Sequence, residues 1–478
     1  MTSLADLPLP TDWPRRKLIT LSAIAHVLLI GIAVRHLFID GHRYGEFFYS
    51  TLNLLEALGL IAFTLTAGIA FGRTVQQASS LEIGFLWRGG ALLTLLALLA
   101  PPFLSSDVFD YVARGYVAVL GHNPYTTTAQ SLTADPVMAD FAAKGHAEWT
   151  FHLMPYGPIT AALQWLVALF GSPWLAIYAW KLLCALCHLA TSGLLLQTMR
   201  VIGSERDARR TFVLWLWNPW ILLECCGSAH NEAFVVLGIA AMGLALAKSR
   251  FFATALAYGA MILVKHGSAP LSLLLFITAC WQKQRMSFLL GAALAIAVTL
   301  GCYSMLWSGP KGLDWITSQQ HVAQGSLPSL LGEMFGDFAK YGALLFGLVA
   351  LTLVCLAGVQ RCKDATSFGR FGALSMSIFV LLLMPNFAPW YQFWWLPLFV
   401  LTQLPLLSRV LELLAWTGPL SYLVFAGTHD LGALHQAWAL LLAGIWPTLL
   451  LMLDWRNLTG IHHKSPVATA AVQAPNQH

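Results

Sequence analysis

Two carboxylates, Asp107 and Asp110, follow directly on a long apolar stretch, within the run S-S-D-V-F-D-Y at residues 105–111. At the edge of a membrane the dielectric constant falls, and a carboxylate there can be tuned as a general base. The alternative is that Asp107 only caps a surface helix that begins near Val108, as aspartate commonly does where a loop meets a helix. Spacing alone leaves both interpretations open.

A second polar cluster, His230, Asn231 and Glu232, interrupts apolar sequence at the expected start of a helix. Free amide groups and the helix dipole favour anions at such a position. Capping of the helix by Asn231 and Glu232 is at least as good an interpretation from spacing alone.

A lysine, Lys265, ends the uncharged stretch 255–264 and is followed by His266. A lysine at that depth requires a counter-charge or must extend to the interface, and a phosphate is a natural partner. Further along, Trp390 and Tyr391 have flat aromatic faces that suit sugar rings. Without other evidence, the aromatic belt of a membrane protein explains these two residues better.

The elements that must position these residues are membrane helices. Of the 478 residues, 58% are hydrophobic and 10% are charged, and the mean hydropathy is +0.67, far from the values of soluble domains. The net charge of +5 arises mostly near span ends, so a nucleic-acid surface is not expected. Most of the eight cysteines lie inside apolar runs, which indicates neither a disulfide framework nor a cysteine metal site.

Hydropathy predicts an all-α polytopic membrane protein that forms a single domain over residues 1–478, with a disordered tail at 464–478. Several of the expected spans are too short to cross the bilayer unaided. We expect about 14 spans, at residues 17–38, 47–71, 84–101, 173–199, 211–223, 233–247, 251–264, 269–280, 287–307, 338–358, 371–385, 392–406, 410–427 and 434–453.

Arginine and lysine recur in alternate connections, so the positive-inside rule predicts that both termini are cytoplasmic. This pattern holds if the apolar stretch 159–171 is interfacial or re-entrant, because at about 13 residues it is below spanning length. Residues 101–173 then form the largest external segment, with short helices along the membrane surface. The same threading predicts that the polar clusters at 226–232 and 265–268 are external.

Taken in order, the polar motifs resemble those of the polyprenyl-phosphate-mannose-dependent α-1,6-mannosyltransferases of bacteria, which are GT-C class membrane glycosyltransferases. Ordered matches spread between residues 100 and 400 are much more specific than any single motif. The motifs are S-x-D-V-[FY]-x-Y at 105–111, R-G at 114–115, N-P-Y at 123–125, P-Y-G-P at 155–158, N-P at 218–219, H-N-E at 230–232 and P-W-Y at 389–391.

The resemblance implies a GT-C-like bundle in the bacterial inner membrane, with a large first external loop at 101–173 and an external, periplasmic active site. It also implies that Asp107 is the catalytic base of a single inverting displacement. A monophosphate leaving group lessens the need for a divalent ion and the sequence has no evident acidic cluster, so we expect no metal and no cofactor. Asp110 stands where no family carboxylate is expected, so it either supports Asp107 or caps a helix. The candidates for donor phosphate binding are Lys265, His266, Arg114 and His230, and those for substrate binding are Asp110, Tyr111, Tyr156, His152, Asn231, Glu232, Trp390 and Tyr391.

The expected partners are a polyprenyl-phosphate-linked sugar donor, a glycan or glycolipid acceptor and the lipid bilayer. A transporter or flippase of lipid-linked sugars is the competing class, but the sequence has no visible inverted repeat and its polar clusters favour one membrane face. A non-catalytic scaffold would leave the carboxylates and the lysine unexplained. Mannose follows from the resemblance alone, and the acceptor and linkage stay open.

Overall fold

The computed structural model describes residues 13–35, 54–102, 104–144, 152–306, 309, 326–384, 387–403, 405–427, 437 and 440–453. All regular secondary structure in these ranges is helical, which confirms the predicted all-α class. The tail at 464–478 lies outside the described residues, as do parts of the predicted spans 17–38, 47–71 and 434–453.

The first half of the chain contains three apolar helices, then a group of short helices, and then the longest of the described helices, α8. The helices are α1 (Arg15–Val34), α2 (Leu54–Gln77), α3 (Ile83–Leu99), α4 (Asp107–Val119), η4 (Ala129–Leu132), α5 (Pro136–Lys144), α7 (Pro158–Ala168), α8 (Pro173–Ile202), α9 (Glu205–Leu216), α10 (Pro219–Leu222), η5 (Leu223–Gly227) and α11 (Glu232–Ala247).

The second half alternates apolar helices with short helical turns. These are α12 (Phe251–Val264), η6 (His266–Ser268), α13 (Leu271–Trp281), α14 (Arg285–Leu306), α16 (Leu327–Phe335), α17 (Asp337–Arg361), α18 (Ala365–Ile378), η9 (Phe379–Leu383), η10 (Pro389–Trp394), η11 (Leu396–Leu398), α19 (Phe399–Thr402), α20 (Pro405–Gly427), η13 (Leu440–Ile445) and α22 (Trp446–Leu453).

Among the described residues, six helices are long and apolar enough to cross a membrane: α1, α2, α8, α14, α17 and α18 with η9. The pair formed by residues 219–227 and α11, bent by 119°, makes a seventh if it counts as one broken span. In α14 and α17 many leucine side chains are exposed, as expected of surfaces that face lipid tails. The membrane character of the chain is thus supported, and the count of about 14 spans stays a prediction.

Two predicted spans are wrong as continuous helices. Residues 211–223 are divided among α9, α10 and the start of η5, with a break at Trp217 and Asn218. Residues 392–406 were expected to cross as a single helix, but the chain there forms η10, η11 and α19 in succession. Pro397 lacks the amide hydrogen that a helix interior uses, which explains part of the break. Gln403 then takes a left-handed conformation with φ 54°, and this ends α19 before α20 begins.

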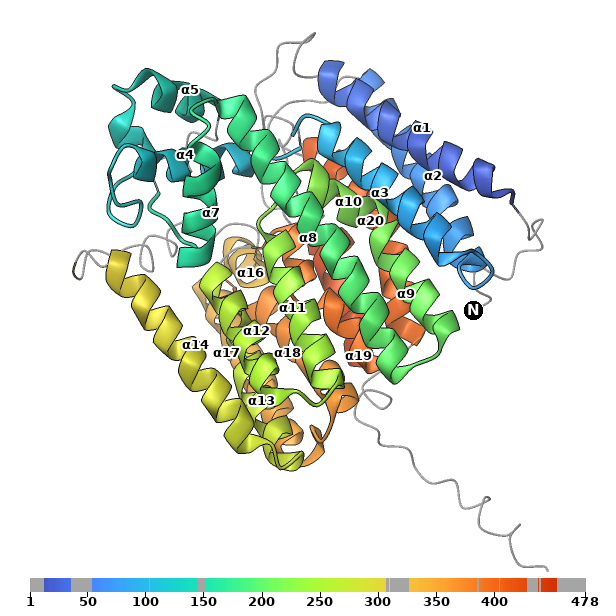
Figure 1. Cartoon of the computed structure of the whole chain (residues 1–478), viewed down its shortest axis with the longest axis vertical. Helices are drawn as coiled ribbons and strands as arrows, with labels where there is room; N and C mark the ends of the chain where they lie inside the picture. The colour runs from blue at the N-terminus through green and yellow to red at the C-terminus, as the bar shows by residue number, and fades with distance from the viewer. Residues whose placement is uncertain are drawn as a thin grey trace, which may run out of the picture.

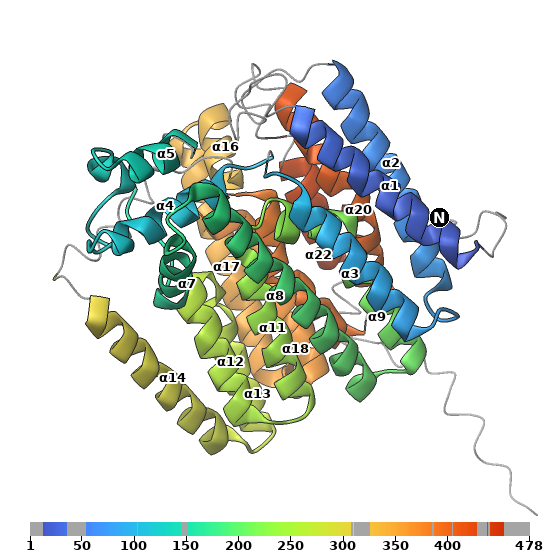
Figure 2. The same cartoon turned by 45° about the horizontal axis from the view of Figure 1, so that its top comes forward.

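The short helices α4, α5 and α7 group together at one end of the molecule, beside the longer helices α8, α11 and α12 (Figures 1 and 2). The described part of residues 101–173 thus contains four short helices, α4, η4, α5 and α7, and their expected place in an external loop at a membrane surface stays a prediction. α7 is 11 residues long, in agreement with an interfacial or re-entrant segment. At this end of the bundle the polar motifs of the sequence come together.

Candidate active site

The loop after α3 delivers Asp107 as the first residue of α4. The Ser105 hydroxyl oxygen accepts a hydrogen bond from the Asp107 amide at 3.2 Å, which fixes the start of the helix. α4 then packs closely on α7 because residue 115 is glycine: a Cβ there would lie 2.1 Å from the Gln164 carbonyl oxygen. The R-G motif thus has a packing role, since Gly115 lets the two backbones meet.

The Asp107 carboxylate is directed toward other side chains of the site. Its Oδ2 accepts a hydrogen bond from the Tyr111 hydroxyl at 3.2 Å and lies 3.4 Å from His230 Nδ1. The capping interpretation is not supported, because α4 begins at Asp107 and its N-cap residue, Ser106, makes no side-chain capping bond. With 23% of its side chain exposed, Asp107 remains within reach of a ligand.

The environment of Asp107 favours its ionised form. Burial alone would raise the pKa of this carboxyl, since desolvation penalises the charge. The His230 side chain, the Lys265 charge and the Tyr111 hydroxyl outweigh burial and hold the pKa of Asp107 below its usual value. Asp107 is therefore a carboxylate, ready to accept a proton, at neutral pH.

The N-P-Y motif joins the loop to two other parts of the site. Asn123 Oδ1 accepts a hydrogen bond from the Tyr125 amide at 2.9 Å, and its Nδ2 donates to the Leu306 carbonyl of α14 at 2.7 Å. The Tyr125 hydroxyl donates to the Tyr156 carbonyl at 2.8 Å. The motif thereby fixes the position of the P-Y-G-P segment.

The P-Y-G-P segment in turn holds the end of α12. The Gly157 amide and the Thr160 hydroxyl both donate to the Val264 carbonyl, at 3.0 and 2.9 Å, and so satisfy a helix-end acceptor. A Cβ at residue 157 would lie 2.1 Å from the Leu263 carbonyl oxygen, so only glycine permits this approach. Lys265 follows immediately, and its position depends on this contact.

We expect Gly157→Ala to destabilise the protein, because the added methyl group must push the end of α12 away from α7. Overpacking of this kind costs about 1–3 kcal/mol. Gly72→Ala is the matched control, since Gly72 lies in α2 and a Cβ there meets no atom within 4 Å. The midpoint of thermal unfolding in detergent should fall for Gly157→Ala alone, and equal midpoints for both variants would contradict this reading.

The counter-charge of Lys265 is Glu232. The ammonium group forms an ion pair with Glu232 Oε1 and lies 3.4 Å from Asn231 Oδ1. It also lies over three aromatic rings, at 5.3 Å from Tyr156, 4.8 Å from Tyr391 and 5.2 Å from Trp394. Lys265 therefore meets the predicted need for a counter-charge within the protein itself.

The H-N-E cluster does not cap α11 in the way that spacing allowed. α11 begins at Glu232, and Asn231, at the N-cap position, makes no side-chain capping bond. Both side chains are fully buried and contact Lys265 instead. Asn231 Nδ2 and Glu232 Oε2 are buried without a hydrogen-bond partner among the described residues. Polar atoms of this kind are the exception in folded proteins and point to a functional site.

His230 lies between Asp107 and Trp390. The Trp390 indole stacks on the fully buried imidazole, with ring centroids 3.8 Å apart and planes inclined by 17°. Tyr391, the next residue, meets Lys265. These contacts favour a role for both aromatic residues in the site over a separate membrane belt, which had been the better interpretation of the sequence.

The other predicted residues lie at different distances from this centre. Arg114 is buried on α4, with its guanidinium carbon 5.9 Å from the Tyr156 ring centroid. Asp110 is buried one turn before it on the same helix. His266 is directed to the Tyr303 hydroxyl of α14 at 2.6 Å, and burial lowers its pKa, which disfavours a permanent cation there. His152 is partly exposed and precedes α7, and its role in substrate binding stays a prediction.

Sequence reasoning missed Glu224, which lies 3.3 Å from His230 through its Oε2. It also missed Tyr422 and Trp220, whose polar hydrogens bind Glu224 Oε1 at 2.6 and 3.1 Å. Glu224 is an acidic residue within the apolar run 219–229, and an ionisable residue in such a run is a functional candidate by default. The sequence therefore contained a signal for Glu224, whereas nothing in it indicated that Tyr422 of α20 contacts this residue.

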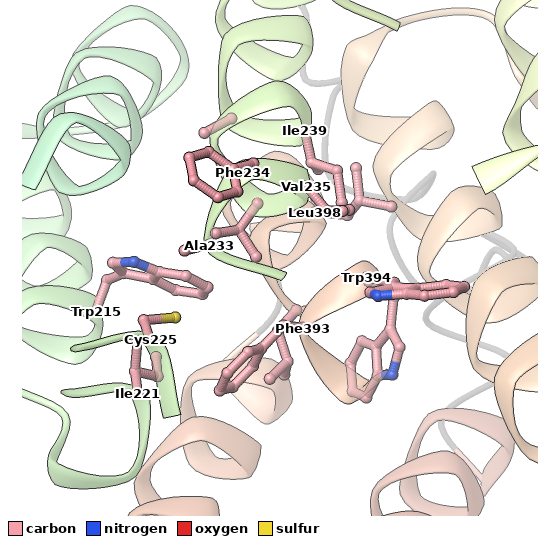
Figure 3. Close-up of a cluster of buried hydrophobic side chains, with 14 of the residues drawn as sticks. Trp215, Ile221, Cys225, Ala233, Phe234, Val235, Ile239, Phe393, Trp394 and Leu398 are labelled. Atoms are coloured by element: carbon pink, nitrogen blue, oxygen red, sulfur yellow. The ribbon is translucent and has the colours of Figure 1, made fainter. Parts of the chain in front are cut away.

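An apolar cluster supports the site from within the bundle. Figure 3 shows Ile221 and Cys225 of one segment, Ala233 and Phe234 at the start of α11, and Phe393 of η10 around a common interior. These side chains are buried, and the Phe393 ring lies 4.7 Å from that of Trp220. The packing holds together three chain segments that carry polar site residues.

No group of three or more His, Cys, Asp or Glu side chains that could hold a metal ion occurs among the described residues. The acidic residues of the site are instead matched by His230 and Lys265, which occupy their immediate surroundings. The site therefore consists of acidic side chains next to His230 and Lys265, with aromatic rings packed against these two residues. Such a set can accept a proton at Asp107 and stabilise negative charge nearby.

Comparison with known proteins gives one family. The model of the alpha-(1->6)-mannopyranosyltransferase N-terminal domain family matches residues 32–283, more than half of the chain. Alpha-(1->6)-mannopyranosyltransferase A of Mycobacterium tuberculosis is 24% identical over 419 residues, which cover 81% of this chain and 78% of the relative. Alpha-(1->6)-mannopyranosyltransferase A of Corynebacterium glutamicum is 22% identical over 322 residues, 60% of this chain and 64% of the relative.

A B-type relative gives a similar result. Alpha-(1->6)-mannopyranosyltransferase B of Corynebacterium glutamicum is 24% identical over 392 residues, which cover 72% of this chain and 64% of the relative. No solved structure matches the chain. The family match covers Asp107, His230 and Lys265, whereas Trp390 and Tyr391 lie beyond it.

Proposed function

The chain belongs to the alpha-(1->6)-mannopyranosyltransferase family, and we propose on that premise that it is a membrane mannosyltransferase with Asp107 as its catalytic base. Its donor is a mannose linked to a polyprenyl phosphate, and its acceptor is a glycan or glycolipid hydroxyl. The reaction takes place at the external face of the membrane, where a lipid-linked donor and a water-borne acceptor can meet. The family match supports the sugar and the enzyme class.

The observation that carries the assignment of the base is the pairing around Asp107. Tyr111 and His230 both contact Oδ2, so Oδ1 is the oxygen that remains for an acceptor hydroxyl. Two groups on one oxygen also fix the rotation of the carboxylate. A general base must lie within hydrogen-bond reach of the proton that it removes, and an oriented, partly exposed carboxylate meets this requirement.

The proposed step is a single inverting displacement. The acceptor oxygen forms a bond to the anomeric carbon while its proton passes to Asp107 Oδ1. The bond between the anomeric carbon and the phosphate oxygen breaks, and its electron pair leaves with the polyprenyl phosphate. Nearby cations stabilise the charge that grows on the phosphate, and Lys265 and Arg114 are the candidates on this side of the bundle.

The test of the function is transfer of radiolabelled mannose from synthetic polyprenyl-phosphate-mannose to a short mannoside by the purified protein in detergent. We expect transfer that EDTA does not reduce, because the reaction needs no metal in this proposal. Polyprenyl-phosphate-glucose and polyprenyl-phosphate-arabinose serve as matched donors. Transfer of glucose or arabinose in preference to mannose would contradict the sugar assignment, and failure with every donor would favour the transporter.

A transporter or flippase makes a different demand on the site. A carrier binds its cargo and releases it on the other side of the membrane without consuming the sugar-phosphate bond. Reconstituted vesicles loaded with labelled donor distinguish the two activities. An enzyme leaves the label on the acceptor, whereas a carrier moves intact donor across the bilayer.

The pH profile of the reaction should report the environment of Asp107. Because its pKa is held below the usual value, the wild-type enzyme keeps its base ionised, and stays active, to a lower pH than an unperturbed carboxylate would allow. His230→Gln removes the side chain that contributes most to lowering the pKa of Asp107. The acid limb of kcat/KM should therefore move to higher pH, and an unchanged limb would contradict the role of Asp107.

A further inference from the structure

Glu224 is a fully buried carboxylate that the proposed reaction does not use directly. It lies in η5 with no side-chain exposure, and a charge in such a place is costly unless it is paired and hydrogen-bonded. Its Oε1 accepts two hydrogen bonds, from the Tyr422 hydroxyl at 2.6 Å and from Trp220 Nε1 at 3.1 Å. These donors come from α20 and α10, so two elements far apart in sequence converge on one oxygen.

The other oxygen of Glu224 is directed to His230. Oε2 lies 3.3 Å from His230 Nε2, while the opposite ring nitrogen, Nδ1, lies 3.4 Å from Asp107 Oδ2. The imidazole therefore bridges two carboxylates, with Trp390 stacked on its face. Among the described residues these two contacts are ionic and do not have hydrogen-bond geometry, but a positive charge on the ring would lie close to both anions, so the arrangement favours an imidazolium between two carboxylates.

The backbone between Glu224 and His230 is held tightly. Residues 223–227 form a π-helical turn, a geometry that is frequent at functional sites, and the His230 amide donates to the Glu224 carbonyl at 3.0 Å. Ala229 has φ 56°, an unfavourable conformation for alanine. Trp180 and Lys181 of α8 donate to the Ala229 and Gly227 carbonyls. The distance between the two side chains is thus set by a constrained turn.

We propose that Glu224 is a positioning residue for Asp107, which acts by holding the His230 imidazole charged and directed at Asp107 Oδ2. The inference rests on the proposed function, since it assigns Glu224 a role only if Asp107 accepts the proton. The charged groups that face this chain of contacts are Asp107 on α4, Lys265 after α12 and Glu232 on α11. Among the described residues, the Nε2 of His230 has Glu224 as its acidic partner.

The contacts from Glu224 through His230 should affect the pKa of Asp107. Without the Glu224 charge, His230 loses one of the two anions that favour its second proton, so its charged form is less stable. Asp107 then has a weaker positive charge beside it. Because a nearby cation lowers the pKa of a carboxyl by about one unit or more, the pKa of Asp107 should rise. The effect of removing Glu224 must stay below that of removing Asp107, because Glu224 acts only through it.

The experiment compares kcat, KM and the pH profile of mannosyl transfer for the wild type, Glu224→Gln and the matched control His188→Gln. Glutamine at 224 keeps the size of the side chain and its acceptor for Tyr422 and Trp220, but it removes the charge. His188 is also fully buried, and its ring contacts the Leu216 carbonyl at 3.3 Å and not Asp107. Each variant is normalised to the folded fraction, as measured by thermal unfolding.

We expect Glu224→Gln to lower kcat about tenfold to a hundredfold, with KM nearly unchanged, and to move the acid limb up by about one pH unit. His188→Gln should change the folded fraction and leave the limb in place. A purely structural role would lower activity equally at all pH values, and such a result would overturn the inference. If Glu224→Gln does not fold, Glu224→Asp retains the charge at a greater distance, and it should move the limb in the same direction by less.

The failure of this inference differs from the failure of the proposed function. If Asp107→Asn abolishes transfer while neither Glu224 variant moves the acid limb of the pH profile, the assignment of Asp107 as the base is supported and the positioning role of Glu224 is contradicted. If Asp107→Asn retains full activity, the assignment of the base falls and takes the positioning role with it.

Discussion

Asp107→Asn is expected to reduce mannosyl transfer by about 10²- to 10⁴-fold, the contribution typical of a general base. Asparagine has the shape of aspartate and still accepts the hydrogen bond from Tyr111, so the fold should persist. It cannot accept the proton of the acceptor hydroxyl. We therefore expect kcat to fall while KM for the donor changes little, as measured with purified protein in detergent.

The matched control for this result is Asp110→Asn, which removes a second buried carboxylate from the first turn of the same helix. We expect a smaller loss for Asp110→Asn, because Asp110 is buried, whereas 23% of the Asp107 side chain is exposed to a ligand. An Asp110→Asn enzyme that is inactive, together with an active Asp107→Asn enzyme, would transfer the role of base to Asp110. Tyr111→Phe tests the orientation of Asp107 separately, and it should cost about tenfold in rate.

The sequence predicted the polar side chains of the centre better than their partners. Asp107, His230, Glu232 and Lys265 stand out in apolar sequence, because an ionisable residue there is costly and needs a reason. Which of them meet depends on how α4, α11 and α12 pack, and periodicity does not carry this information. The ion pair with Glu232 gives Lys265 a partner within the protein that the sequence did not name, and the binding of a phosphate by Lys265 stays a prediction.

The roles of the glycines show a similar limit. The P-Y-G-P and R-G motifs read as turns or family marks, whereas the structure gives both a steric reason. Gly115 meets the Gln164 carbonyl and Gly157 meets the Leu263 carbonyl, and in both cases the two residues are far apart in sequence. A sequence predicts that a glycine permits close approach, but it does not name the backbone that approaches.

The break in the region 392–406 was missed for a different reason. The stretch is apolar and long enough to span, so hydropathy favours one helix. The chain instead forms short turns whose aromatic residues, Trp390, Tyr391 and Trp394, surround His230 and Lys265. Irregular backbone at membrane depth is tolerated where protein buries it, and here it brings aromatic rings to the site.

Lys265→Met is expected to destabilise the protein by about 3–5 kcal/mol, the cost of leaving one member of a buried ion pair without its partner. Glu232 is fully buried, so its charge cannot reach water when the ammonium group is removed. Glu232→Met should cost less, because 12% of the Lys265 side chain is exposed and its ammonium group still lies over three aromatic rings. The midpoints of thermal unfolding in detergent should follow this order.

The double variant Lys265→Met/Glu232→Met separates the structural role of the pair from a role in binding the donor phosphate. Replacement of both charges by apolar side chains of similar size is often neutral or stabilising, so most of the lost stability should return. If Lys265 binds the phosphate, the double variant should still have a raised KM for the donor and a lowered kcat although its stability is restored, because the cation is absent. If the double variant has wild-type kinetics, the role of Lys265 is only to neutralise Glu232. Arg114 is then the candidate cation that stabilises the leaving group.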